Sequence, residues 1–239
     1  MSTARTIVAA ALATFAFTSS ANAVTSFFDG IFNNSNWNLT TITNASGAGS
    51  TAQGFQVLAG GNPNEYRRIR HQLVVGAAGN GAVHSIHLNN TAFYTPSSQG
   101  AITSINYSED SINFLPTQGG NGQGTGLAIF QAGRYYELRN PTLVMPASGF
   151  TNWAPNAATG TIATDYWEVS GAGILNSSSN PDFTITGSIM QLGFWRGNSA
   201  NQNINTDCGI DNWHVDIIPT PGSFALLGLG GLAAIRRRR

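Results

Sequence analysis

Pairs of acidic residues are the first candidates for chemistry, because glycoside hydrolysis uses two carboxylates that converge on one bond. Glu109 and Asp110 are adjacent, and Asp165 and Glu168 are three residues apart within a segment predicted to be a strand. Side chains alternate between the two faces of a strand, so both spacings send the carboxylates to opposite faces. We therefore expect solvated edge carboxylates here, and a catalytic pair would have to come from two different strands.

Neither the histidines nor the serines give a catalytic or zinc-binding pattern. His84 and His87 are three residues apart, which separates them across a sheet and argues against a shared zinc ion. No G-x-S-x-G sequence is present to hold a serine nucleophile on a sharp turn. We expect a domain that is not an enzyme.

Two further acids lie in apolar registers. Asp29 alternates with Phe27 and Ile31 in the first predicted strand, and Asp211 alternates with Trp213 in the last. An unpaired carboxylate in such a register is costly. Either each acid accepts hydrogen bonds from a turn or pairs with an arginine, or the two share a structural Ca²⁺, which prefers oxygen ligands. The second alternative requires the first and last strands to be neighbours.

A basic segment at 67–70 follows a turn that contains Gly and Pro. Alternation places Tyr66, Arg68 and Arg70 on one face, where an aromatic ring and cations suit a sugar or an acidic polysaccharide. The other face of the segment is mixed and suits the core. Alternatively, the arginines form a solvated face and pair with the many acids. The indole rings that offer either stacking platforms or core packing are those of Trp153, Trp167 and Trp195.

The elements that carry these residues are predicted to be short strands, because alternating runs are separated by Gly, Asn, Pro and Ser. Ala132-Gly133 is predicted to be a tight hairpin turn, and 118–126 and 197–207 are predicted to be loops. The pattern predicts an all-β sandwich, and the order of its strands resembles that of jelly-roll sandwiches of the lectin-like or carbohydrate-binding-module kind. The predicted strands are 25–32, 37–42, 54–58, 66–75, 82–88, 101–107, 126–131, 134–138, 161–169, 183–186, 189–195 and 210–217.

The ends of the chain read as targeting segments. Arg5, an apolar stretch at 7–17 and the sequence Ala21-Asn22-Ala23 predict a signal peptide over 1–23, which leaves a β-sandwich domain at 24–218. Without Arg5 and the four terminal arginines, six basic residues face eleven acidic ones, a net charge near −5. This charge disfavours nucleic acid as a partner. Cys208 is the only cysteine, so it forms no disulfide within the chain, and we expect it to be buried.

The last residues, 219–239, have three parts. Proline residues that cannot continue a strand come first, then an apolar run of thirteen residues at 223–235, then four arginines. The run is shorter than the roughly 20 residues of a stable span, and terminal arginines hold the end on the cytoplasmic side. The residues that form the pattern around the run are Pro219, Thr220, Pro221, Gly222, Ser223, Arg236, Arg237, Arg238 and Arg239.

This tail resembles the PEP-CTERM sorting signal of bacterial exosortase substrates, with Thr220 where that family usually has Glu. The resemblance implies processing by an exosortase-type enzyme, a transient membrane anchor, and a final location in the cell envelope, at the cell surface or in an exopolysaccharide matrix; the alternative is an uncleaved tail anchor. Two functional hypotheses follow for the domain: a non-catalytic surface or matrix protein, or a glycan-binding module. A secreted glycan hydrolase or lyase is the third hypothesis.

Overall fold

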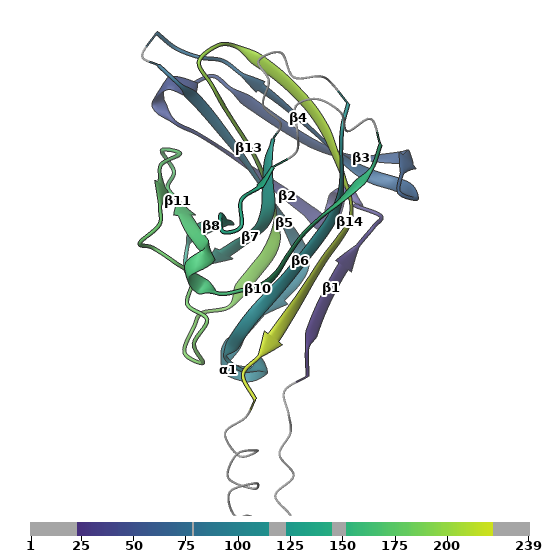
Figure 1. Cartoon of the computed structure of the whole chain (residues 1–239), viewed down its shortest axis with the longest axis vertical. Helices are drawn as coiled ribbons and strands as arrows, with labels where there is room; N and C mark the ends of the chain where they lie inside the picture. The colour runs from purple at the N-terminus through teal and green to yellow at the C-terminus, as the bar shows by residue number, and fades with distance from the viewer. Residues whose placement is uncertain (1–22, 78, 115–122, 145–151, 222–239) are drawn as a thin grey trace, which may run out of the picture. The chain divides into compact units, whose positions relative to one another are not determined.

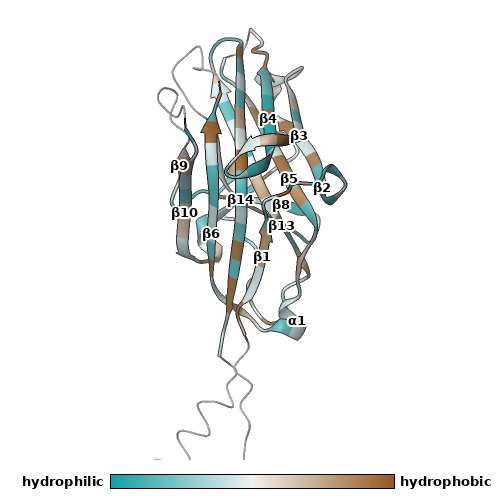
Figure 2. Cartoon of the chain, turned by 90° about the vertical axis from the view of Figure 1, so that its right-hand side faces the viewer, coloured by the Kyte–Doolittle hydropathy of each residue, from teal (hydrophilic) through white to brown (hydrophobic). Residues whose placement is uncertain are grey.

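Alternation of apolar and polar residues along the strands builds two antiparallel sheets that pack face to face (Figure 1). The computed structural model describes residues 23–77, 79–114, 123–144 and 152–221. In the last strand, Trp213, Val215 and Ile217 are buried and alternate with more exposed neighbours. Figure 2 shows this alternation of hydropathy along the strand that it labels β14. The predicted all-β sandwich is confirmed.

The first sheet, here called sheet A, has the strand order β10-β6-β14-β4-β3. Strand β1 pairs with the C-terminal part of β14. The first and last strands are therefore neighbours, which is the condition that a cation shared by Asp29 and Asp211 requires. The bounds of these strands are β1 Thr25–Asp29, β3 Thr51–Gly61, β4 Asn64–Leu73, β6 Ile102–Asn113, β10 Ala154–Thr161 and β14 Ile204–Pro219.

The second sheet, sheet B, has the order β12-β11-β8-β7-β13-β5-β2, and β9 pairs with β7. In the described part of the chain, helix is limited to α1 (Pro96–Gln99) and three 3₁₀ turns. None of these described helices is long and apolar enough to cross a membrane. The bounds of the sheet B strands are β2 Trp37–Thr43, β5 Gly81–Tyr94, β7 Gly124–Gln131, β8 Arg134–Leu138, β9 Leu143–Val144, β11 Tyr166–Val169, β12 Leu175–Asn176 and β13 Met190–Ala200.

The turn between β7 and β8 has the predicted form. Gln131 pairs with Arg134, and Ala132 and Gly133 both have positive φ, at 51° and 79°. Two successive positive φ values are what a type I′ hairpin turn requires. The turn fixes the register of β8, whose bounds are those predicted.

Four predicted segments differ from the structure. Residues 161–169 are not one strand, because the Asp165 carboxylate accepts a hydrogen bond from the Ile162 backbone N–H and closes a turn between β10 and β11. Residues 183–186 form no strand, and 197–207 is mostly strand, with β13 and β14 joined across 201–203. The Asn- and Ser-rich composition of that hairpin hid its strands. The loop predicted at 118–126 is likewise strand from Gly124 onward.

The targeting segments lie mainly outside the described residues. This holds for the predicted signal peptide, apart from its last residue, and for the tail beyond Pro221. Within the described part, β14 runs two residues beyond its predicted end, to Pro219, and the Thr220 backbone N–H donates to the Ala101 carbonyl at 2.6 Å. The folded strand therefore stops where the proline residues begin.

Candidate functional site

Strand β4 presents its basic segment on two faces, as the alternation predicted. Arg67, Ile69 and His71 point between the sheets, and each is at most 2% exposed. Burial lowers the pKa of Arg67 to about 10, and its Nε donates to Nδ1 of His87 at 3.3 Å. Arg67 is therefore part of the core, and the outer face of β4 is left for contact with a ligand.

On the outer face, Asp207 of β14 holds both remaining arginines of the segment. Arg68 donates to the two carboxylate oxygens from Nε and Nη2, at 2.7 and 2.6 Å, and Arg70 donates from Nε at 3.1 Å. The guanidinium groups also lie over aromatic rings, Arg68 at 4.9 Å from the Phe114 centroid and Arg70 at 5.3 Å from the Phe55 centroid. The interpretation that these arginines pair with acids is confirmed, and Arg70 remains exposed.

Tyr66, predicted to be part of the sugar-binding face, is buried at 4% exposure. Its ring meets Trp153 edge to face at a centroid distance of 5.3 Å, and burial raises its pKa. Trp153 is half-buried and donates from Nε1 to the Gly60 carbonyl at 2.9 Å. Tyr66 therefore supports Trp153 and contributes almost no accessible surface, because the β3–β4 turn and Trp153 cover it.

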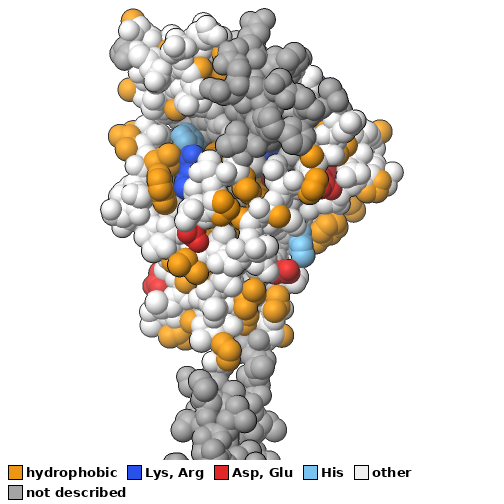
Figure 3. All heavy atoms as spheres, viewed as in Figure 1, with side chains coloured by type: hydrophobic (Ala, Val, Ile, Leu, Met, Phe, Trp, Pro, Cys, Tyr) orange, Lys and Arg blue, Asp and Glu red, His pale blue; other side chains and the backbone are white. Residues whose placement is uncertain are grey.

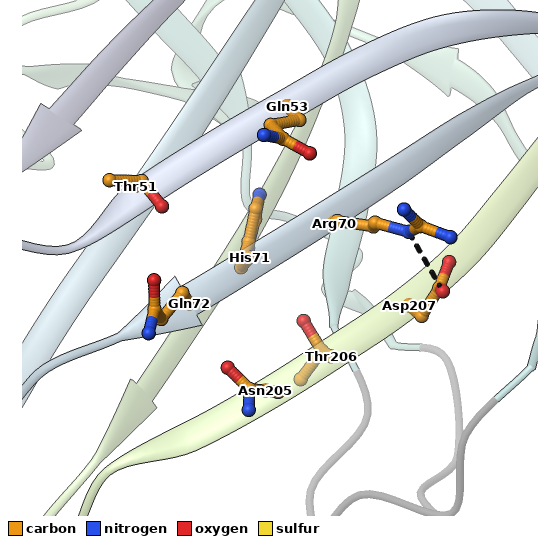
Figure 4. A pocket seen from close by; sticks show the side chains of 8 residues that line it. All are labelled: Thr51, Gln53, Arg70, His71, Gln72, Asn205, Thr206 and Asp207. Atoms are coloured by element: carbon orange, nitrogen blue, oxygen red, sulfur yellow. Dashed lines mark hydrogen bonds and ion pairs between the residues drawn. The ribbon is translucent and has the colours of Figure 1, made fainter.

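An open pocket of about 370 Å³ lies beside Arg70 on the outer face of sheet A (Figure 4). Register explains how residues far apart in sequence meet there: Gln72 lies between Thr51 and Asn205, and Arg70 lies between Gln53 and Asp207. All except Asp207 are exposed. We call this surface the outer trough; it consists of Thr51, Gln53, Arg70, Gln72, Asn205 and Asp207.

Trp195, a predicted stacking platform, is 1% exposed in a second apolar cluster on the outer side of sheet B. The guanidinium carbon of Arg139 lies 4.1 Å from the ring centroid and covers it. Trp195 is therefore inaccessible as a platform in this structure. Trp167 is half-buried in β11.

Asp29 points to the inner face of sheet A, as its alternation with Phe27 indicated, and both of its carboxylate oxygens accept hydrogen bonds. Its Oδ1 accepts hydrogen bonds from the backbone N–H groups of Ile31 and Phe32, both at 2.8 Å, and its Oδ2 accepts from Trp37 Nε1 at 2.8 Å. The strand stops at Asp29, so Ile31 is exposed instead of sharing the inner face. The carboxylate caps a turn, which is one of the two alternatives considered.

Asp211 does not share a face with Trp213, which corrects the predicted register. From Asp211 to His214, β14 advances three residues while β6 advances only two, from Asp110 to Ser108. The extra residue is Asn212, whose φ is 50°. This β-bulge turns Asp211 outward.

Asp29 and Asp211 therefore lie on opposite faces of sheet A, which does not fit the second alternative, a cation shared by the two acids. Asp211 is buried beneath the β3–β4 turn, where the Asn62 and Asn212 backbone N–H groups donate to it at 2.5 and 2.7 Å. Burial raises the pKa of Asp211 to about 6. In the described part of the chain, no three His, Cys, Asp or Glu side chains are grouped so as to hold a metal ion.

The other acids also have partners. Glu109 and Asp110 point to opposite faces, as predicted, but Glu109 is buried and pairs with Arg196, so it is not a solvated edge residue. Asp165 accepts from the Asn140 side chain in the turn before β11, and Glu168 pairs with Arg134 at 2.9 Å. These carboxylates have structural partners instead of converging in a cleft.

The histidines are separated as predicted. His84 Nδ1 lies 2.8 Å from Glu137 Oε1 on the outer side of sheet B, whereas the His87 ring stacks on Phe194 between the sheets at a centroid distance of 4.5 Å. His71 is buried between Asn198 Oδ1 at 2.7 Å and the Ser85 hydroxyl at 2.8 Å. Burial holds the pKa of His71 down at about 4 and that of His87 well below its usual value.

A buried polar network joins the two sheets, and no local pattern in the sequence predicted it. The Glu109 carboxylate of β6 pairs with the Arg196 guanidinium of β13 at 3.0 Å, and neither side chain is exposed. The same carboxylate accepts hydrogen bonds from the hydroxyl groups of Tyr107, Ser111 and Thr125. Since its members come from separate strands, local spacing could not reveal the network.

Cys208 is buried, as expected, and belongs to the edge of this network. Its Sγ lies 2.6 Å from Gln123 Oε1, and burial raises the pKa of the thiol to about 12. A thiol that is neutral and inaccessible is a poor nucleophile. Cys208 therefore acts as a small core residue.

Comparisons with known proteins bear on the fold alone. No family model matches the chain, and no curated protein matches it. Among solved structures, the chain is similar to the CBM22-1 xylan-binding domain from Paenibacillus barcinonensis Xyn10C, with 6% sequence identity and a TM-score of 0.33. The match covers 84% of this chain and 97% of that chain. A likeness at this level carries no information about the ligand or the site residues.

Proposed function

We propose that the domain is a non-catalytic glycan-binding module that contacts its ligand through the outer trough. The observation that carries the proposal is a group of five exposed polar side chains on three adjacent strands, beside the half-buried ring of Phe55. The amides of Gln53, Gln72 and Asn205 each donate and accept hydrogen bonds, as sugar hydroxyl groups do. A trough with amides, a hydroxyl and one cation suits a polyhydroxylated ligand.

The charged part of the trough is held in place before any ligand arrives. Arg70 is fixed by the Asp207 carboxylate and by its position over Phe55, and Asp207 is fixed in turn by the paired hydrogen bonds from Arg68. Side chains that are already ordered lose less conformational entropy on binding. The Arg70 Nη groups can therefore donate to a sugar oxygen at a small entropic cost.

The first test is a glycan array followed by titration calorimetry with the strongest ligand. We expect the variants Arg70→Gln and Gln53→Ala to weaken binding, Arg70→Gln by about tenfold or more, because it removes a charged donor. Arg70→Gln leaves Asp207 paired with Arg68, so the fold should be retained.

Arg134→Gln serves as the matched control, because Arg134 is an exposed arginine on sheet B with a single carboxylate partner. It should bind as tightly as the unmodified domain. Absence of any glycan ligand, or equal affinity for the Arg70 and Gln53 variants and the control, would rule out the trough as the binding surface.

We also propose that the chain is exported and sorted to the cell surface or to an extracellular polysaccharide matrix. The Ala21-Asn22-Ala23 site and the PEP-CTERM-like tail support this proposal. The mature protein is expected to begin at Val24, and removal of the tail by an exosortase-type enzyme would release the membrane anchor. N-terminal sequencing and intact mass of the secreted protein measure both ends, and a retained Met1 would contradict the first of these expectations.

A further inference from the structure

A second pocket lies on the other sheet, on the outer side of β5, β7 and β13, and its volume is about 370 Å³. Trp195 forms its base: the indole ring is buried under Arg139, as described above, and packs against the backbone of two glycines. A Cβ atom at Gly124 would fall 2.7 Å from the ring, and one at Gly197 would fall 2.9 Å from it. The wall on one side comes from Gly173 and Leu175. Figure 3 shows few charged side chains on the face that it draws. The pocket has one cation among its described lining residues.

That cation is Arg139, which directly follows β8. Its backbone N–H donates to the Asp165 carbonyl at 2.8 Å, and its guanidinium lies on Trp195. One Nη donates to the buried carboxylate of Glu137. Its Nε is buried and has no hydrogen-bond partner among the described residues. The side chain as a whole is 16% exposed, and a buried N–H that has no partner leaves part of the hydrogen-bonding capacity of the guanidinium unused.

The remaining polar groups of the pocket favour an acidic ligand. Among the described lining residues, Arg139 is the only charged one, and the His84 ring and the Ser199 hydroxyl line the same space. Glu137 does not line the pocket, because it is fully buried and its two oxygens are engaged by His84 and by Arg139. A guanidinium group with free N–H donors recognises a carboxylate best, through charge-assisted hydrogen bonds.

We propose that this pocket binds the carboxylate of an acidic sugar, a uronate unit, next to Arg139 and His84. Recognition of the carboxylate rests on the pocket itself, and the assignment of a sugar rests on the proposed glycan-binding function. The two sites lie on different sheets and share no residue. The outer trough can therefore fail as a binding surface while this pocket succeeds, and the reverse also holds.

The test is an NMR titration of the domain with glucuronate, glucose and acetate, in which the indole N–H resonance of Trp195 is followed. Glucuronate is expected to shift this resonance and to bind at least tenfold more tightly than glucose. Equal affinity for glucose, or no shift with glucuronate, would overturn the proposal. Acetate that binds as tightly as glucuronate would overturn the assignment of a sugar.

Two variants separate binding from folding. Arg139→Gln should weaken glucuronate binding about tenfold or more, but it also leaves Glu137 with one partner fewer. Ser199→Tyr fills the pocket from an exposed position and leaves the ion pairs intact, so it should abolish binding in a folded protein. Arg134→Gln on β8, an exposed arginine that lines neither pocket, should bind glucuronate normally. Unchanged affinity in both pocket variants would overturn the location.

Discussion

Replacing Glu109 with glutamine is expected to lower the free energy of unfolding by about 3–5 kcal/mol, because it leaves the Arg196 charge buried without a counterion. Arg196 has no exposed surface, and both of its Nη groups lie within 3.1 Å of the carboxylate. The guanidinium can reach neither water nor another carboxylate that would compensate it. Urea or thermal unfolding measures the loss, which for a domain of this size corresponds to a drop in Tm of roughly 10 °C.

Two further variants make the cause of this loss specific. Glu168→Gln breaks the exposed pair with Arg134 and should cost less than about 1 kcal/mol. The double variant Glu109→Gln/Arg196→Met removes both charges and keeps an acceptor for Tyr107 and Ser111, so it should be more stable than Glu109→Gln alone. A double variant no more stable than Glu109→Gln would show that the hydroxyl network, and not the uncompensated charge, sets the cost.

The strands that could be predicted from the sequence are those with an undisturbed alternation and a clear turn. β8 has the bounds that were predicted, because the Ala132-Gly133 turn fixes one end and two aromatic residues that favour strands follow it. Pro219 marked the end of β14 because proline cannot continue the ladder. Local chemistry was sufficient in both cases.

The alternation failed where one residue was inserted or a side chain closed a turn. Asn212 shifts the register of β14, and as a result Asp211 faces the opposite side from the one predicted. Asp165 interrupts the predicted strand 161–169, because its carboxylate accepts a hydrogen bond from the Ile162 backbone N–H. Neither event changes the composition of the segment, so a count of apolar positions does not detect it.

Sequence reasoning identified the residues of the candidate site that lie on one strand, β4, but not those that neighbouring strands contribute. Arg68 and Arg70 were identified on the correct face of β4, but Gln53 and Asn205 join them from β3 and β14 through strand pairing over long sequence separations. The same limit hid Arg139, which reaches the pocket on Trp195 from the end of β8. Tyr66 was placed on the correct face, but the covering ring of Trp153 comes from a distant segment.

His71 makes the stability of the domain depend on pH. Burial lowers its pKa to about 4, whereas a histidine in the unfolded chain titrates near 6.5. Between these values the unfolded state binds a proton that the folded state does not, so the free energy of unfolding falls as the pH falls. The stabilisation is fully present above pH 6.5 and is lost by about 1.4 kcal/mol per pH unit below it. His87, whose pKa is also held down by burial, acts in the same direction.

Asp211 opposes the histidines, because its pKa of about 6 lets the folded state hold a proton that the unfolded chain has released. Its contribution is present at low pH and is lost as the pH rises through 6. Urea unfolding between pH 4.5 and 7 should therefore show His71→Gln flattening the fall in stability toward acid and Asp211→Asn steepening it. In each variant, the slope of the free energy of unfolding against pH should change by an amount that approaches the effect of one proton, about 1.4 kcal/mol per pH unit. Parallel curves for the unmodified domain and His71→Gln would mean that His71 is charged in the folded state, which its position between Asn198 and Ser85 does not favour.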